Sequence, residues 1–80
     1  MAYGNVVVMD NAHISDGAVI FGPAIIGRNV TIGKNTLVDN CVLWDGANVG
    51  HSCEMRNCLV GFNVTVPSNT DVAESALTEI

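Results

Sequence analysis

Large aliphatic residues recur along the chain at steps of six, and from Val38 onwards every third step is five. Amphipathic helices place apolar residues near a period of 3.6, so this spacing argues against a long helix and for a short repeat. The first position of each repeat unit is therefore predicted to face the core. The predicted core residues are Val8, Ile14, Ile20, Ile26, Ile32, Val38, Leu43, Val49, Met55, Val60, Val66 and Val72.

The recurring five-residue step indicates that three units make one coil. Each unit then supplies one short strand, which pairs in parallel with the equivalent strand of the next coil, and branched aliphatic side chains suit such packing. Strand spacing gives about four triangular coils and a prism roughly 19 Å tall. The fifth residue of each unit is also predicted to point inwards, which includes Val42 and Leu59 in two of the five-residue units.

The fourth position of most units suits a sharp corner. Asparagine and glycine tolerate the left-handed backbone that such a corner requires. They occupy this position at Asn11, Gly17, Asn29, Asn35, Gly46, Asn63 and Asn69. A different set falls on the third corner of each coil, which is therefore expected to turn differently and more tightly: Pro23, Cys41, Cys58 and Ser75.

The hexads Ile26-Gly27-Arg28-Asn29 and Ile32-Gly33-Lys34-Asn35 resemble the repeats of the left-handed parallel β-helix, the hexapeptide-repeat fold. Residues 22–27, 40–50 and 57–61 are similar to the C-terminal β-helix of sugar-nucleotide pyrophosphorylases, especially mannose-1-phosphate guanylyltransferase-like proteins. The resemblance implies an all-β fold, a left-handed coil, and a module that follows a nucleotide-binding catalytic domain and serves assembly or regulation. It implies no catalytic residue here, because the sequence has no Gly-rich phosphate loop with basic residues.

The 80 residues predict one domain, with residues 1–5 as an N-terminal cap and residues 6–77 as the coils. A segment of a longer protein is favoured over a complete small protein. The net charge of −5, with Arg28, Lys34 and Arg56 as the basic residues, argues against nucleic acid as a partner. There is no apolar run that could span a membrane and no signal peptide. Three cysteines without paired spacing favour the cytoplasm.

His13 and His51 are the candidates for catalysis, because many hexapeptide-repeat proteins are acyltransferases with a histidine general base. Such a base must reach the acceptor hydroxyl in a cleft that holds an acyl-CoA donor. The repeat register leaves no room for an inserted loop at either histidine, so solvated surface histidines are favoured. A minimal acyltransferase with His13 or His51 at a subunit interface remains the alternative, and no cofactor is expected.

Cys41 and Cys58 lie one coil apart in the predicted register, close enough for a disulfide. An unbonded stack of small residues continued by Ser75 is favoured, Cys53 is expected in the core, and the cysteines do not suggest a zinc site. Charges alternate along two corners, and weak support of the register is favoured over an anion site. These corner columns are Asp10, Arg28 and Asp45, and Asp16, Lys34 and His51.

Outward apolar residues are predicted to gather on two adjacent sides that share the third corner. A contiguous apolar patch usually marks an interface. The chain is therefore expected to form a homo-oligomer and to act as a structural assembly module, with a trimer favoured and end-to-end pairing as the rival. A regulatory site for a sugar phosphate or nucleotide is a weaker alternative. The interface candidates are Val19, Phe21, Ile25, Leu37 and Trp44.

Overall fold

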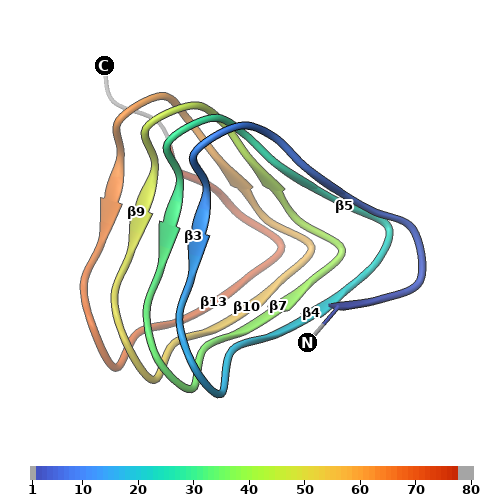
Figure 1. The fold of residues 1–80 in the computed structure, drawn as a ribbon. Helices are drawn as coiled ribbons and strands as arrows, with labels where there is room; N and C mark the ends of the chain where they lie inside the picture. The colour runs from blue at the N-terminus through green and yellow to red at the C-terminus, as the bar shows by residue number, and fades with distance from the viewer. Residues whose placement is uncertain (1, 78–80) are drawn as a thin grey trace.

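The computed structural model describes residues 2–77, and in this range the chain forms strands and no helix. The strands stack in parallel into a β-solenoid of about four turns, as the repeat predicted (Figure 1). Three sheets form the walls. Sheet A consists of β1 (Ala2–Tyr3), β4 (Val19–Phe21), β7 (Leu37–Asp39), β10 (Glu54–Arg56) and β13 (Asp71–Ala73). Sheet B consists of β2 (Val6–Val8), β5 (Ala24–Ile26), β8 (Val42–Leu43), β11 (Leu59–Val60) and β14 (Ala76–Leu77). Sheet C consists of β3 (His13–Ile14), β6 (Thr31–Ile32), β9 (Asn48–Val49) and β12 (Thr65–Val66).

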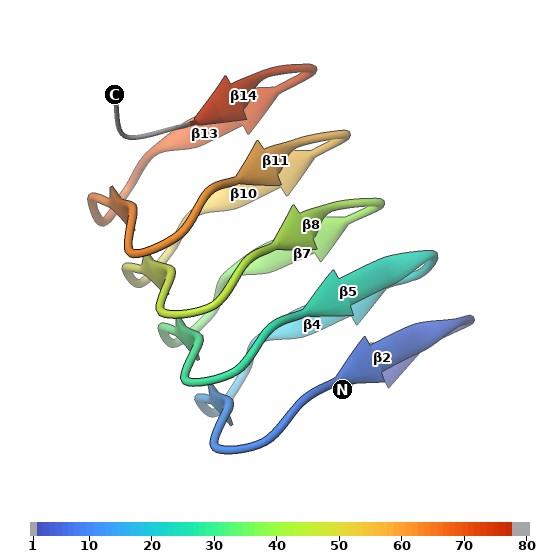
Figure 2. The same ribbon diagram turned by 90° about the horizontal axis from the view of Figure 1, so that it is seen from above.

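The coil is left-handed. In Figure 1 the chain runs anticlockwise around the triangle, and it moves away from the viewer as it passes from the first coil to the last. Figure 2 shows the same coils from the side, stacked with little rotation between neighbours. The fold therefore departs from the right-handed crossover that most parallel strands follow.

The interior confirms the predicted register and corrects its first residue. The central members of the predicted core, such as Ile26, Leu43 and Met55, have no exposed side-chain surface. Val8 is 47% exposed although it pairs in register with Ile26, because no coil lies beneath it at the N-terminal end of the stack. Ile14 and Val72, near the two ends, are partly buried for the same reason.

Two of the three corners have the predicted left-handed backbone. Asn29, Asn35 and Asn63 have φ values near +58°, and the glycines at equivalent positions are also in this region. A side chain on Gly46 would collide with the amide of Asn63, which reaches across from the next coil. Glycine is thus required at this corner by both its backbone angle and its neighbour.

The third corner turns differently, as expected, but by another arrangement than the one predicted. Its left-handed residues are Asn40, Asn57 and Glu74, one position before the cysteines and Ser75. Cys41 therefore lines up with Ala24 inside the tube and not with Pro23, which follows a cis peptide bond.

This shift also overturns the prediction that Val42 and Leu59 point inwards. Both pair in register on the outer face of sheet B, where Ile25 occupies the equivalent place in the previous coil. The five-residue units are one residue shorter at the corner. The cysteine therefore takes the inward position. The outer face of sheet B is consequently more apolar than the sequence suggested.

The N-terminal segment, expected as a cap, contributes a strand to the wall. Ala2 pairs with Ile20 and Tyr3 with Phe21, so β1 extends sheet A by one strand. Met1 lies outside the described residues. The coil register therefore begins before the expected boundary at residue 6 and runs to Leu77 in β14.

Candidate functional site

Sheet B has a continuous row of apolar side chains on its outer face. We call this row the apolar stripe, and each member pairs in register with the next: Val7, Ile25, Val42, Leu59 and Ala76. Side chains alternate between the faces of a strand, so the residues on either side of each stripe position point into the core. The stripe itself carries no charged group, and its first two members are 53% and 42% exposed.

A hollow of about 400 Å³ lies beside the apolar stripe, over Gly27. We call it the Gly27 hollow. Trp44 and Phe62 form one wall, with ring centroids 4.7 Å apart in an edge-to-face arrangement, and Met9 and Ile25 contribute apolar side chains to its lining. A Cβ atom at Gly27 would lie 2.8 Å from the backbone nitrogen of Asp45, so the close approach of the two coils at this point requires glycine.

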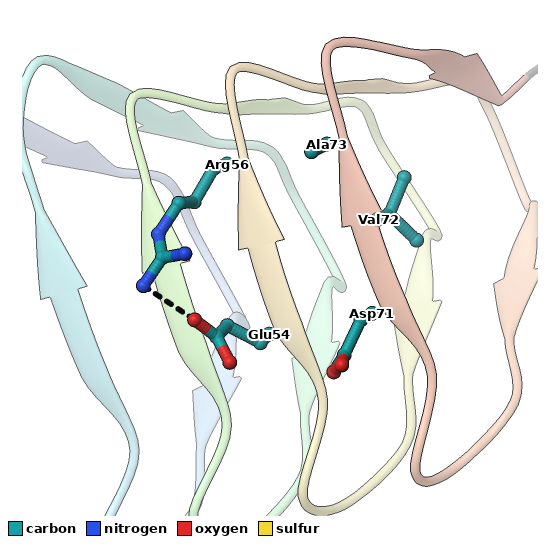
Figure 3. A pocket seen from close by; sticks show the side chains of 5 residues that line it. All are labelled: Glu54, Arg56, Asp71, Val72 and Ala73. Atoms are coloured by element: carbon teal, nitrogen blue, oxygen red, sulfur yellow. Dashed lines mark ion pairs between the residues drawn. The ribbon is translucent and has the colours of Figure 1, made fainter.

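The outer face of sheet A is divided between an apolar and a charged half. The rings of Tyr3 and Phe21 stack at 5.3 Å on the first two strands. On the last two strands Arg56 forms an ion pair with Glu54, and Asp71 pairs in register with Glu54 (Figure 3). Two adjacent carboxylates with one cation leave this half acidic, which disfavours contact with another acidic surface.

The interface candidates fall into two groups on either side of the third corner. Val19, Phe21 and Leu37 lie on sheet A, and Ile25 and Trp44 lie on or beside sheet B. Phe21, Ile25 and Trp44 are each about 40% exposed, whereas Val19 and Leu37 are partly buried. Whether these side chains contact a partner stays a prediction.

The two histidines lie apart from these apolar surfaces. His13 points outwards on sheet C, in register with Thr31, whereas His51 lies at the corner after β9. Both are exposed, and Nδ1 of His51 is 3.4 Å from the hydroxyl of Ser52. They lie two coils apart in the stack. The structure therefore does not bring them together, and neither lines the Gly27 hollow.

Comparison with known families gives one match that spans almost the whole chain. The model of the GMPPB C-terminal domain family matches residues 2–79. The chain belongs to this family. The match fits a C-terminal module of a nucleotidyltransferase, in agreement with the resemblance seen in residues 22–27, 40–50 and 57–61. No curated protein matches the chain.

In this member of the GMPPB C-terminal domain family, the cysteines are free thiols buried in the tube. Sγ of Cys41 donates to the carbonyl of Asp39 at 3.1 Å, and Sγ of Cys58 donates to that of Arg56 at 2.9 Å. Ser75 repeats this bond in the last coil, which confirms the stack of small residues. Burial raises the pKa of the Cys41 thiol, and a backbone hydrogen bond at Cys58 offsets part of the rise.

The charged corner columns lack the side-chain ion pairs that their alternation suggested. Along the column of Arg28, the backbone nitrogen of Arg28 donates to the carboxylate of Asp45 at 2.8 Å. Within residues 2–77, the only ion pair between side chains joins Arg56 and Glu54. The guanidinium of Arg28 is thus exposed and has no carboxylate partner in the described part of this family member.

Residues 2–77 contain no group of three histidine, cysteine or acidic side chains placed to hold a metal ion. In the same range no helix is long and apolar enough to cross a membrane.

Most of the apolar stripe was not predicted from the sequence. Val7, Val42 and Leu59 were not among the interface candidates, because the register placed the last two inside the tube. The sequence did contain a signal for this register in Asn40 and Asn57. An asparagine directly before each cysteine can take the left-handed conformation at the corner.

Proposed function

We propose that this chain is an assembly module: it associates with further copies of itself through its apolar outer surface and performs no chemistry of its own. The observation that carries the proposal is the apolar stripe, an uncharged sheet face on a chain of net charge −5. A contiguous exposed apolar surface of this kind usually marks an interaction site. A role in assembly also suits the C-terminal module of a nucleotidyltransferase.

The physical argument rests on the burial of this face. Removing apolar surface from water stabilises a complex by about 25 cal/mol per Å². The stripe can be covered without desolvating a charge, whereas a partner on sheet A would have to cover Glu54, Arg56 and Asp71. Self-association through the apolar stripe therefore gains free energy from burial, and the nearest ions, Arg28 and Asp45, lie beside the stripe and not within it.

The acyltransferase alternative has less support. It needs a histidine beside a cleft that can hold an acyl donor. His13 and His51 are exposed on sheet C and at a corner, outside the hollows described above. We therefore treat the alternative as a prediction to be tested and not as a second proposal.

Sedimentation velocity over a range of concentrations tests the proposal. The wild type should give a mass above that of the 8.4 kDa monomer at high concentration. Ile25→Glu places a charge in the apolar stripe and should shift the distribution to monomer. Thr31→Glu is the matched control, because Thr31 also points outwards from a strand, on the polar sheet C. A wild type that stays monomeric at millimolar concentration would refute self-association.

A further inference from the structure

The column beside the apolar stripe alternates between large side chains and glycine. Its members follow the last core residue of each sheet B strand, and the backbone bonds of Met9 to Ile26, Gly27 to Leu43 and Trp44 to Val60 place them one above another. From the first coil upwards the order is Met9, Gly27, Trp44 and Gly61. Trp44 thus projects one coil above the Gly27 hollow.

The next column along the corner alternates in charge over its first three coils and ends in an aromatic residue. Its members, from the first coil upwards, are Asp10, Arg28, Asp45 and Phe62. Arg28 lies at the level of the Gly27 hollow and Asp45 lies at the level of Trp44. The exposed guanidinium of Arg28 lacks a carboxylate partner in the described chain. A large and a small group therefore alternate over four coils in one column, and anion, cation and anion alternate over the first three coils of the next.

We propose that two copies of this chain pair face to face through sheet B, related by a two-fold axis that runs along the strands between the coils of Gly27 and Trp44. This inference rests on the proposed self-association and adds its face, its symmetry and its contacts. Such an axis reverses the order of the coils and keeps each column opposite the same column of the partner. The coils stack with little rotation, so the correspondence holds across the face (Figure 2).

Reversal of the coil order brings complementary groups together at the two central levels, whereas at the outer levels Asp10 faces the partner's Phe62. Trp44 enters the hollow over the partner's Gly27, and the same contact forms a second time across the axis. In the apolar stripe, Ile25 faces the partner's Val42, so aliphatic groups meet aliphatic groups. At the corner, Arg28 faces the partner's Asp45, which supplies the carboxylate that its guanidinium lacks within residues 2–77 of its own chain.

Other arrangements of the same face lose these contacts. A two-fold axis along the solenoid and through this column would keep the coil order, so Trp44 would meet the partner's Trp44 and the Gly27 hollow would stay empty. A three-fold arrangement around the third corner would not place the same column of two copies opposite each other. The alternation is self-complementary only when the coil order is reversed, which is the property an isologous interface requires.

The size of the face sets the strength of the contact. Two faces of a body that measures 31 × 25 × 20 Å bury on the order of 1,000 Å² in total, at the lower bound for a specific interface. The pair should therefore dissociate on dilution. An anchor ring in a hollow carries much of the affinity in interfaces of this kind, so Trp44→Ala should weaken association by roughly tenfold or more.

Cysteine cross-linking tests the reversed order directly. Val7→Cys and Leu59→Cys, three coils apart in the apolar stripe, are prepared as separate proteins and treated with a short bismaleimide, alone and as a mixture. The native cysteines are buried, and wild type in the same reaction measures their background. We expect the mixture to give far more cross-linked dimer than either protein alone, because Val7 lies opposite the partner's Leu59, whereas two copies of the same residue are offset by three coils, about 14 Å.

Charge reversal gives an independent measurement. Arg28→Glu places an anion opposite the partner's Asp45 and should weaken association several-fold by sedimentation. Lys34→Glu makes the same charge change at a corner between sheets C and A and should leave association unchanged. Equal effects of the two variants would overturn the assigned contact.

The outcomes separate this inference from the proposed function. Equal cross-linking in the mixture and in the single proteins, or a mass of three copies, would overturn the two-fold pairing. A dimer by sedimentation with no cross-linking would place the contact on another face, and self-association would stand. A monomer at every concentration would refute both proposals.

Discussion

The side chains of Asn40 and Asn57, in adjacent coils, are joined by a hydrogen bond of 2.7 Å from Nδ2 of Asn40 to Oδ1 of Asn57. Both residues have a left-handed backbone, with φ values of 53° and 52°. The same residue type thus satisfies two requirements of the third corner. It tolerates the backbone conformation, and its amide can bond to the equivalent amide one coil away.

Replacement of Asn57 should separate these two roles. Asn57→Ala places a Cβ-bearing residue without a local polar group in the left-handed region and removes the amide bond, so we expect a loss of about 1–2 kcal/mol. Asn57→Gly removes the bond but keeps a permitted backbone, and its loss should be smaller. Urea unfolding of the three proteins measures the difference. An alanine variant as stable as the glycine variant would contradict the backbone argument.

The hydroxyl of Thr36 is expected to be worth more inside the tube than an ordinary surface hydroxyl. It donates to the carbonyl of Gly50 at 2.8 Å and accepts from the backbone nitrogen of Cys53 at 3.3 Å. Thr36→Val keeps the shape and leaves both backbone groups without this partner, so stability should fall by about 1–3 kcal/mol. Thr31→Val, on the outer face of sheet C, is the control and should change stability by far less. Chemical denaturation of both variants decides the point.

A charge in the middle of the tube should unfold the protein. Ile32 is fully buried, and a carboxylate there would have no partner to compensate its lost hydration. We therefore expect Ile32→Asp to lose its β circular dichroism, while Thr31→Asp, one residue earlier and outward, keeps it. An Ile32→Asp protein with the wild-type melting temperature would refute the core register.

The pKa of Cys41 predicts a loss of stability in alkali. Burial raises this pKa above the ordinary value of 9.0, so the folded state holds the thiol proton more tightly than the unfolded state. The stability from this group is present below pH 9 and is lost as the pH rises through the folded pKa. Unfolding free energies measured in urea at pH 8 and pH 10 should show the fall. Cys41→Ala should show a smaller fall, and an equal fall would assign the effect to other groups.

Acyl transfer by the isolated chain is not expected. Both histidines lie in unbroken repeats, exposed on sheet C and at the corner that follows it. An assay with acetyl-CoA and a panel of amine and hydroxyl acceptors should give no turnover above the uncatalysed rate. Turnover that disappears in His13→Ala or His51→Ala would show that the alternative function is correct.

The sequence predicted the coil better than it predicted the surface, and the reason lies in what each depends on. Core positions such as Ile26 and Leu43 repeat with the backbone, so a count along the sequence finds them. Whether Val42 points inwards or outwards depends on which residue of the third corner takes the left-handed conformation. The spacing does not decide between Asn40 and Cys41. A shift of one residue moves a side chain to the other face of the strand.

The end of the stack shows the same limit. Val8 satisfies the pattern and points towards the axis, yet half of its surface is open because burial requires a neighbour on both sides. The sequence period predicts the direction in which a side chain points. Its burial also depends on the coils above and below it. The Gly27 hollow was equally hidden, since residues from four coils line it.

The nearly constant length of the coil also shapes how the chain must fold. The later coils bond residues 17 positions apart, as in Asn40 with Asn57, Arg28 with Asp45 and Thr36 with Cys53, and the first coils pair residues 18 positions apart, as in Val8 with Ile26. Each coil added to an existing one closes a loop of similar size and therefore meets a similar entropic barrier. Growth should proceed as a zipper from a nucleus in the middle of the chain, where a coil can template in both directions, while the two outer coils open first.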